Sequence, residues 1–157
     1  MKTIFVSARG LLLLCLGLLA SPLAAQNGPL KWTFESSHVQ GDEFELVFTA
    51  EIQKGWATYS QFLTSDEGPV PTTVTFESTN ASVLGDGTEE GHKVQVDKDP
   101  VFDIPLVKFK DTYVIRKRIK VSDYRTPVVG HVTAMCCDDE KCLPPKDFEF
   151  SFQLKKP

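Results

Sequence analysis

Residues 43–52 read EFELVFTAEI, so that a hydrophobic side chain occupies every second position. Alternation with a period of two is typical of a β-strand that has one buried and one exposed face. The same alternation occurs near the end of the chain, in residues 148–154, and less regularly in residues 113–121. Residues 128–135 are predicted as a strand that runs into the cysteines, and weaker strand candidates are residues 30–35, 56–60, 72–78 and 101–109.

Short turn-forming groups separate these segments, and no amphipathic helix long enough to connect parallel strands lies between them. The pattern predicts an all-β, antiparallel β-sandwich. The acidic pair Glu89-Glu90 is interpreted as a solvated turn. The turn signals are Gln40-Gly41-Asp42, Lys54-Gly55, Glu67-Gly68-Pro69, Gly85-Asp86-Gly87 and Asp99-Pro100.

The first 25 residues have the pattern of an export signal. Lys2 and Arg9 precede the apolar run 11–20, and the small residues Ala24-Ala25 follow it. The run is too short to span about 30 Å of hydrocarbon as a helix. We therefore expect cleavage near Ala25, a periplasmic location and, because 157 residues with 41% hydrophobic content suit one core, a single domain over residues 26–157.

Net charge bears on the class of partner. Without the basic residues of the signal, the chain carries 15 Lys and Arg against 21 Asp and Glu, a net charge of −6. Nucleic acid binding requires a basic face that neutralises phosphates. The sequence therefore predicts no nucleic acid partner.

Three cysteines remain after the signal, namely Cys136, Cys137 and Cys142. Adjacent Cα atoms lie about 3.8 Å apart, below the usual range for a disulfide of about 4.4–6.8 Å, which disfavours a bond between the first two. If the preceding strand continues, Cys136 shares a face with Val132 and Ala134 as a small buried hydrophobe, and Cys137 points the other way. A bond between Cys137 and Cys142 would close a short loop and add little stability, which is typical of a bond meant to open.

Metal sites fit the sequence poorly. His131 with the three cysteines lacks the ligand spacing of a tetrahedral zinc site. The acidic residues from Asp97 to Asp103 resemble the start of a calcium loop, but Phe102 stands where glycine is required and Lys108 where glutamate is required. We expect neither a metal nor another cofactor.

The run from Val132 to Pro145 resembles the C-D-D-x-x-C-L-P-P signature of the N-terminal periplasmic domain of the thiol:disulfide interchange protein DsbD. Residues 55–61, GWATYSQ, are similar to the glycine-aromatic-x-x-tyrosine segment of that family, and residues 99–103, DPVFD, to its cap loop. The resemblance covers residues 29–155, although only the cysteine motif is specific. Consecutive prolines after Cys142 oppose a helix there, so the motif is not the thioredoxin C-x-x-C that opens a helix.

The resemblance implies an immunoglobulin-like sandwich with a redox-active disulfide. Cys142 would form mixed disulfides with partners and Cys137 would resolve them, while Phe102, with Tyr59 beside it, would shield the pair. The best studied members space their cysteines one residue wider, a spacing that Cys136 and Cys142 would match, so both pairings stay open.

In the family, this domain receives electrons from a thioredoxin-like partner and passes them to oxidised periplasmic proteins, including disulfide isomerases and thioredoxins of cytochrome c maturation. The full-length members also have a membrane domain and a thioredoxin-like domain, which this chain lacks, so a separate membrane reductase is a further expected partner. The alternative function is an exported module that binds a protein or glycan and uses Cys137 and Cys142 only as a structural staple.

Overall fold

The structure is a computed structural model that describes residues 28–64 and 67–157. The predicted export signal, residues 1–25, lies outside this part. The described residues include no helix that is long and apolar enough to cross a membrane. They form eight strands: β1 (Leu30–Gln40), β2 (Glu43–Ile52), β3 (Ala57–Tyr59), β4 (Thr73–Phe76), β5 (Ala81–Val96), β6 (Leu106–Val121), β7 (Val128–Cys137) and β8 (Cys142–Phe152).

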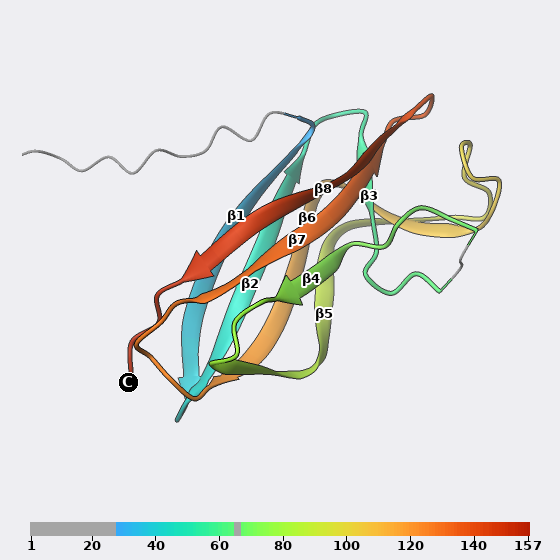
Figure 1. Cartoon of the computed structure of the whole chain (residues 1–157). Helices are drawn as coiled ribbons and strands as arrows, with labels where there is room; N and C mark the ends of the chain where they lie inside the picture. Colours follow the sequence, from blue (N-terminus) through green and yellow to red (C-terminus); the bar gives the residue numbers. More distant parts are fainter. Residues whose placement is uncertain (1–27, 65–66) are drawn as a thin grey trace, which may run out of the picture.

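The strands form two layers joined through β3 (Figure 1). One layer has the order β1-β2-β6-β5, and the other has the order β8-β7-β4. The short strand β3 pairs with β6 at Thr58 and Tyr59 and with β7 at Ala57 and Thr58. Because every pairing is antiparallel, the predicted all-β, immunoglobulin-like antiparallel sandwich is confirmed.

The alternating segments supply the core between the layers. Phe48 of β2 is fully buried, and its ring centroid lies 5.0 Å from that of Phe150 in β8 and 5.8 Å from that of Phe34 in β1. Phe76 of β4 also contacts Phe150, at 5.4 Å. The edge-to-face contacts among these rings add to the burial of apolar surface and hold the two layers together.

Three boundaries differ from the sequence prediction. Residues 81–96 form the long strand β5, and Gly85-Asp86-Gly87 lies at a shift of register inside that strand instead of at a turn between strands. Conversely, β6 begins at Leu106, so residues 101–105 belong to a loop. Strand β8 begins at Cys142 and therefore includes both prolines that were expected to precede it.

Gly130 of β7 pairs with Phe76 of β4, where the two backbones approach closely. A Cβ atom there would overlap the Thr75 carbonyl oxygen and would lie 2.7 Å from Cζ of Phe150. We predict that Gly130→Ala lowers the free energy of unfolding by about 1–3 kcal/mol, because the β4 backbone must move to make room. Urea unfolding measures this loss, with exposed Ser151→Ala on β8 as the control. A loss below about 0.5 kcal/mol, the size typical of surface substitutions, would contradict the prediction.

Candidate functional site

The β7–β8 hairpin brings the cysteines together. Along most of the hairpin the register pairs Val128 with Phe152 and continues to Ala134 opposite Lys146. If that register continued, Leu143 would face Cys137. Instead, the register shifts by one residue between Ala134 and Cys136, and Cys142 lies directly opposite Cys137.

The shift coincides with Pro144 and Pro145 of β8. Proline has no backbone N–H, so it cannot donate to the ladder of hydrogen bonds, and within sheets it is confined to edge strands and bulges. Two consecutive prolines therefore suit a bulge at this point of an edge strand. The prolines that the sequence analysis used only to exclude a helix thus accompany the change that aligns the two sulfurs.

The structure contains a disulfide between Cys137 and Cys142, whose Cα atoms lie 4.0 Å apart. This is one of the two pairings that the sequence left open. Asp138 closes the tip of the hairpin: its N–H donates to the Lys141 carbonyl at 3.0 Å, and its carboxylate accepts from the backbone N–H groups of Glu140 and Lys141 at 2.9 and 2.8 Å. These backbone hydrogen bonds lower the pKa of the Asp138 carboxyl below its ordinary value.

The two sulfurs differ in access. Cys137 is buried, with 3% of its surface exposed, whereas Cys142 is half-buried. Cys137 belongs to a small apolar cluster, separate from the main core, that contains both predicted shielding residues, Tyr59 and Phe102. Their rings meet edge to face with centroids 5.9 Å apart. The four residues that sequence analysis assigned to the site are therefore neighbours.

The loop between β5 and β6 carries Phe102, and an ion pair that sequence analysis missed anchors this loop. Asp99 and Lys108 are both buried, and the Lys108 ammonium lies 2.8 Å from a carboxylate oxygen of Asp99. Burial alone would raise the pKa of Asp99, but the hydrogen bond from Lys108 and the bonds from two backbone N–H groups hold it below its ordinary value. One feature of the sequence could have indicated this pair. Lys108 follows Leu106 by two residues, so in a strand its side chain shares the buried face of Leu106.

A second polar network holds the segment that follows Tyr59. The Glu89 carboxylate accepts hydrogen bonds from the Ser60 hydroxyl at 2.7 Å, the Tyr113 hydroxyl at 2.9 Å and the Gln61 N–H at 3.2 Å. Only 5% of the Glu89 side chain is exposed. The interpretation of Glu89-Glu90 as a solvated turn was therefore wrong, because Glu89 lies in β5 and its carboxylate accepts hydrogen bonds from the segment after β3 and from Tyr113 of β6.

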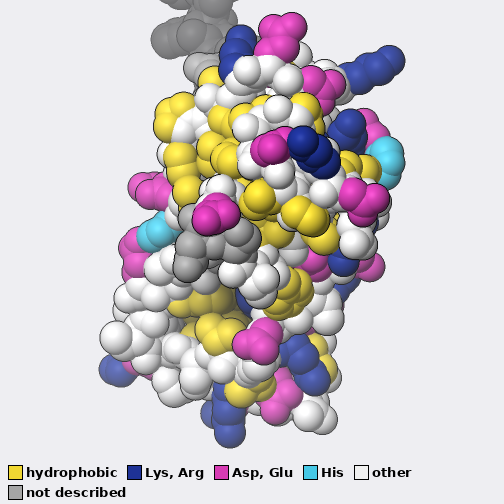
Figure 2. All heavy atoms as spheres, turned by 90° about the vertical axis from the view of Figure 1, so that its right-hand side faces the viewer, with side chains coloured by type: hydrophobic (Ala, Val, Ile, Leu, Met, Phe, Trp, Pro, Cys, Tyr) yellow, Lys and Arg dark blue, Asp and Glu magenta, His cyan; other side chains and the backbone are white. Residues whose placement is uncertain are grey.

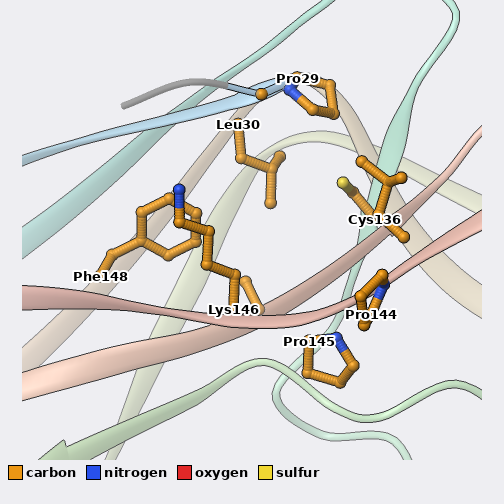
Figure 3. A pocket seen from close by; sticks show the side chains of 10 residues that line it. Pro29, Leu30, Cys136, Pro144, Pro145, Lys146 and Phe148 are labelled. Carbon is orange, nitrogen blue, oxygen red and sulfur yellow. The ribbon is translucent and has the colours of Figure 1, made fainter. Parts of the chain in front are cut away.

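Cys136 lies on the other face of β7, as strand alternation predicts. It has a free, buried thiol packed into the main core. Burial, with a smaller contribution from the negative charge of Asp138, raises the pKa of this thiol from 9.0 to about 11. Figure 3 shows Cys136 beside an apolar groove of about 340 Å³ between Leu30 and the prolines of β8.

The β3–β4 and β5–β6 segments expose several large hydrophobic side chains. Phe62 and Val70, which lie between β3 and β4, are 49% and 43% exposed, and Val101 of the β5–β6 loop is 39% exposed. Both segments lie on the right-hand side of Figure 1. Figure 2 shows this side of the molecule, where hydrophobic side chains gather among charged ones. Exposed apolar groups gathered in this way are typical of a surface that binds another protein.

The part of the chain that the structure describes has no cluster of three or more His, Cys, Asp and Glu side chains able to hold a metal ion. His131 is engaged otherwise, since its Nδ1 lies 2.8 Å from a Glu77 carboxylate oxygen. The acidic residue Asp99, which the calcium-loop comparison considered, is bonded to Lys108.

Comparisons with known proteins place the fold. No family model and no curated protein sequence matches the chain. Its fold is similar to that of the N-terminal periplasmic domain of ScsB from Proteus mirabilis, with a TM-score of 0.62, 17% identity and coverage of 85% of this chain and 49% of that one. The chain thus spans about half the length of that structure.

A second similar structure is the N-terminal domain of Neisseria meningitidis DsbD in the reduced form. The TM-score is 0.50 at 18% identity, and the match covers 77% of this chain and 83% of that one. At these identities the likeness shows a shared fold. It is the fold that the sequence resemblance to the DsbD N-terminal domain implied.

The raised pKa of Cys136 leads to a prediction on reactivity. Because thiolate is the nucleophile, alkylation of Cys136 by iodoacetamide at pH 7.5 should be at least about 100-fold slower in the folded protein than in urea, and should rise about tenfold per pH unit up to pH 10. Mass spectrometry of the oxidised chain measures this, with Cys15→Ser so that Cys136 is the sole free thiol. Rapid stoichiometric labelling at pH 7.5 would contradict the prediction.

Proposed function

We propose that this protein is a thiol-disulfide interchange domain whose working cycle opens and re-forms the Cys137–Cys142 bond. The observation that carries the proposal is the placement of this bond at the tip of a hairpin, with Cys137 buried in the apolar cluster that includes Tyr59 and Phe102, and with Cys142 half-buried. A bond that closes so short a loop contributes little to stability, so a purely structural purpose explains it poorly.

The difference in access between the two cysteines supports a separate role for each sulfur. A thiolate of a reduced partner attacks Sγ of Cys142, a bond forms between the two proteins, and the electrons of the broken S–S bond leave on Cys137 as a thiolate. The second thiol of the partner then attacks the partner's own sulfur in the mixed disulfide. This releases Cys142 as a thiolate, so the domain gains two electrons and the partner leaves with a disulfide.

Delivery of these electrons reverses the order. The Cys142 thiolate attacks the disulfide of an oxidised protein, and Cys137 then attacks Sγ of Cys142 and releases that protein in reduced form. Cys137 needs to reach only its immediate neighbour, which suits a buried resolving thiol. Asp138, Asp139 and Glu140 disfavour a thiolate at the tip, and Lys141 is the one cation among these loop residues.

A shielded pair of this kind fits an electron carrier. Phe102 and Tyr59 cover the buried side of the bond, and the neighbouring acidic groups lower its reactivity toward small oxidants. A protein partner that displaces Phe102 and brings its own thiolate would overcome both obstacles. The exposed side chains Phe62, Val70 and Val101 of the β3–β4 and β5–β6 segments offer such a partner apolar contacts.

The similar structures support both the class of chemistry and the compartment. One is a periplasmic domain of ScsB, and the other is a DsbD N-terminal domain crystallised in the reduced form. By analogy, this domain works in the periplasm after cleavage of residues 1–25, and thioredoxin-like proteins serve as its donors and acceptors. A separate membrane reductase would supply the electrons, and disulfide isomerases or cytochrome c maturation proteins would receive them.

Trapping tests the proposal directly. In a Cys136→Ser background, Cys137→Ala should accumulate a mixed disulfide through Cys142 with a thioredoxin-like protein that lacks its second active-site cysteine, because neither protein can then resolve the bond. Non-reducing electrophoresis and mass spectrometry detect the adduct.

The matched control is Cys142→Ala in the same background. With Cys15→Ser added to both variants, it leaves the buried Cys137 as the only thiol and should give little adduct. Absence of any adduct with Cys137→Ala, or equal adduct through Cys137, would contradict the proposed function and the assigned roles respectively.

A further inference from the structure

The loop between β5 and β6, residues 97–105, contains one deeply buried charge. Asp99 is 1% exposed, whereas Lys98 and Asp103 of the same loop form an ion pair with side chains that are 71% and 75% exposed. Ionised side chains are almost never fully buried unless they are paired. The partners of Asp99 therefore indicate what its burial achieves.

Both carboxylate oxygens of Asp99 have defined partners. Oδ1 accepts hydrogen bonds from the backbone N–H groups of Val101 at 3.0 Å and Phe102 at 3.3 Å. Oδ2 accepts from Nζ of Lys108 at 2.8 Å. The Asp99 N–H also donates to the Ile104 carbonyl, and its own carbonyl accepts from Asp103 N–H, both at 2.9 Å. Asp99 thus fixes the shape of the loop and ties it to β6.

This anchoring point is linked through Tyr59 and Phe102 to the cluster that contains the disulfide. Lys108 is the cross-strand partner of Tyr59, whose ring contacts Phe102. Phe102 and Tyr59 lie in the same apolar cluster as Cys137 and Cys142. One carboxylate therefore holds the backbone of the shielding residue through Oδ1 and the strand opposite the second shielding residue through Oδ2.

Stability alone is a weak reason for such a pair. Burying two charges removes both from water, and well-packed hydrophobic residues often serve equally well or better. A charged carboxylate instead fixes the orientation of its surroundings, because two N–H groups and an ammonium must all point toward its oxygens. These hydrogen bonds therefore fix the position of the Phe102 backbone and, with it, the position of the ring.

We propose that Asp99, anchored by Lys108, is the positioning residue that holds Phe102 over the Cys137–Cys142 bond and so controls access to it. The inference rests on the proposed function, in which opening of this bond is the working step. Asp99 does not touch the reacting sulfurs. It acts through Phe102, and this dependence makes the inference testable.

The test is the rate at which dithiothreitol reduces the bond in the folded, oxidised protein. Phe102→Ala should raise this rate about three- to tenfold, the factor that corresponds to one lost aromatic contact. Asp99→Asn, which keeps the size of the side chain but removes its charge, should raise the rate by a similar factor. Lys108→Met removes the same contact from the β6 side and should behave alike.

The double variant Asp99→Asn with Phe102→Ala separates positioning from general weakening of the fold. If Asp99 acts through Phe102, the double variant is reduced no faster than Phe102→Ala alone, because the two changes share one effect. Multiplied effects would overturn the inference. The matched control is Asp103→Asn, which removes the exposed ion pair of the same loop and should leave the rate unchanged.

Circular dichroism establishes that each variant is folded, and if Asp99→Asn is not, Lys108→Met with Phe102→Ala provides the same comparison. An unchanged rate in Asp99→Asn and Lys108→Met would overturn the inference. Because dithiothreitol needs no protein partner, this result is independent of the trapping experiment. A failure to trap any thioredoxin-like protein would remove the proposed function, whereas accelerated reduction in the Asp99 variant would still establish the positioning role.

Discussion

The alignment of Cys137 with Cys142 depends on the one-residue shift in the β7–β8 register. With a regular ladder, Leu143 would stand opposite Cys137 and the two sulfurs would not face each other. Pro144 and Pro145 accompany the shift because neither can donate a ladder hydrogen bond. This local register pairs the buried residue Cys137 with the half-buried residue Cys142 and leaves a four-residue acidic tip between them.

Strand alternation then gives adjacent cysteines different chemistry. Cys136 faces the main core, where burial raises its pKa to about 11, and Cys137 faces the small cluster formed with Tyr59 and Phe102. One peptide bond therefore separates a buried free thiol of raised pKa from a bridged one. The same small cluster includes Phe102, whose loop is held by hydrogen bonds to the buried carboxylate of Asp99.

Much of this could be predicted from sequence, because alternation of apolar residues fixes which side chains of a strand share a face. It identified β2, the core of β8 and the opposite orientations of Cys136 and Cys137. It missed β5, because Gly85-Asp86-Gly87 resembles a turn and lies instead at an irregularity within a long strand. It also missed the Asp99–Lys108 pair and the partners of Glu89, since buried polar contacts join residues whose separation in sequence carries no periodic signal.

The reduction potential of the Cys137–Cys142 bond tests the central claim most directly. Equilibration of the oxidised chain with thiol buffers of known potential, followed by quantification of free thiols, gives the value. A bond that serves as an electron carrier should have a potential above about −300 mV, in the range of exchange-active disulfides at about −120 to −270 mV. A value well below about −300 mV would identify the bond as a structural staple and contradict the account.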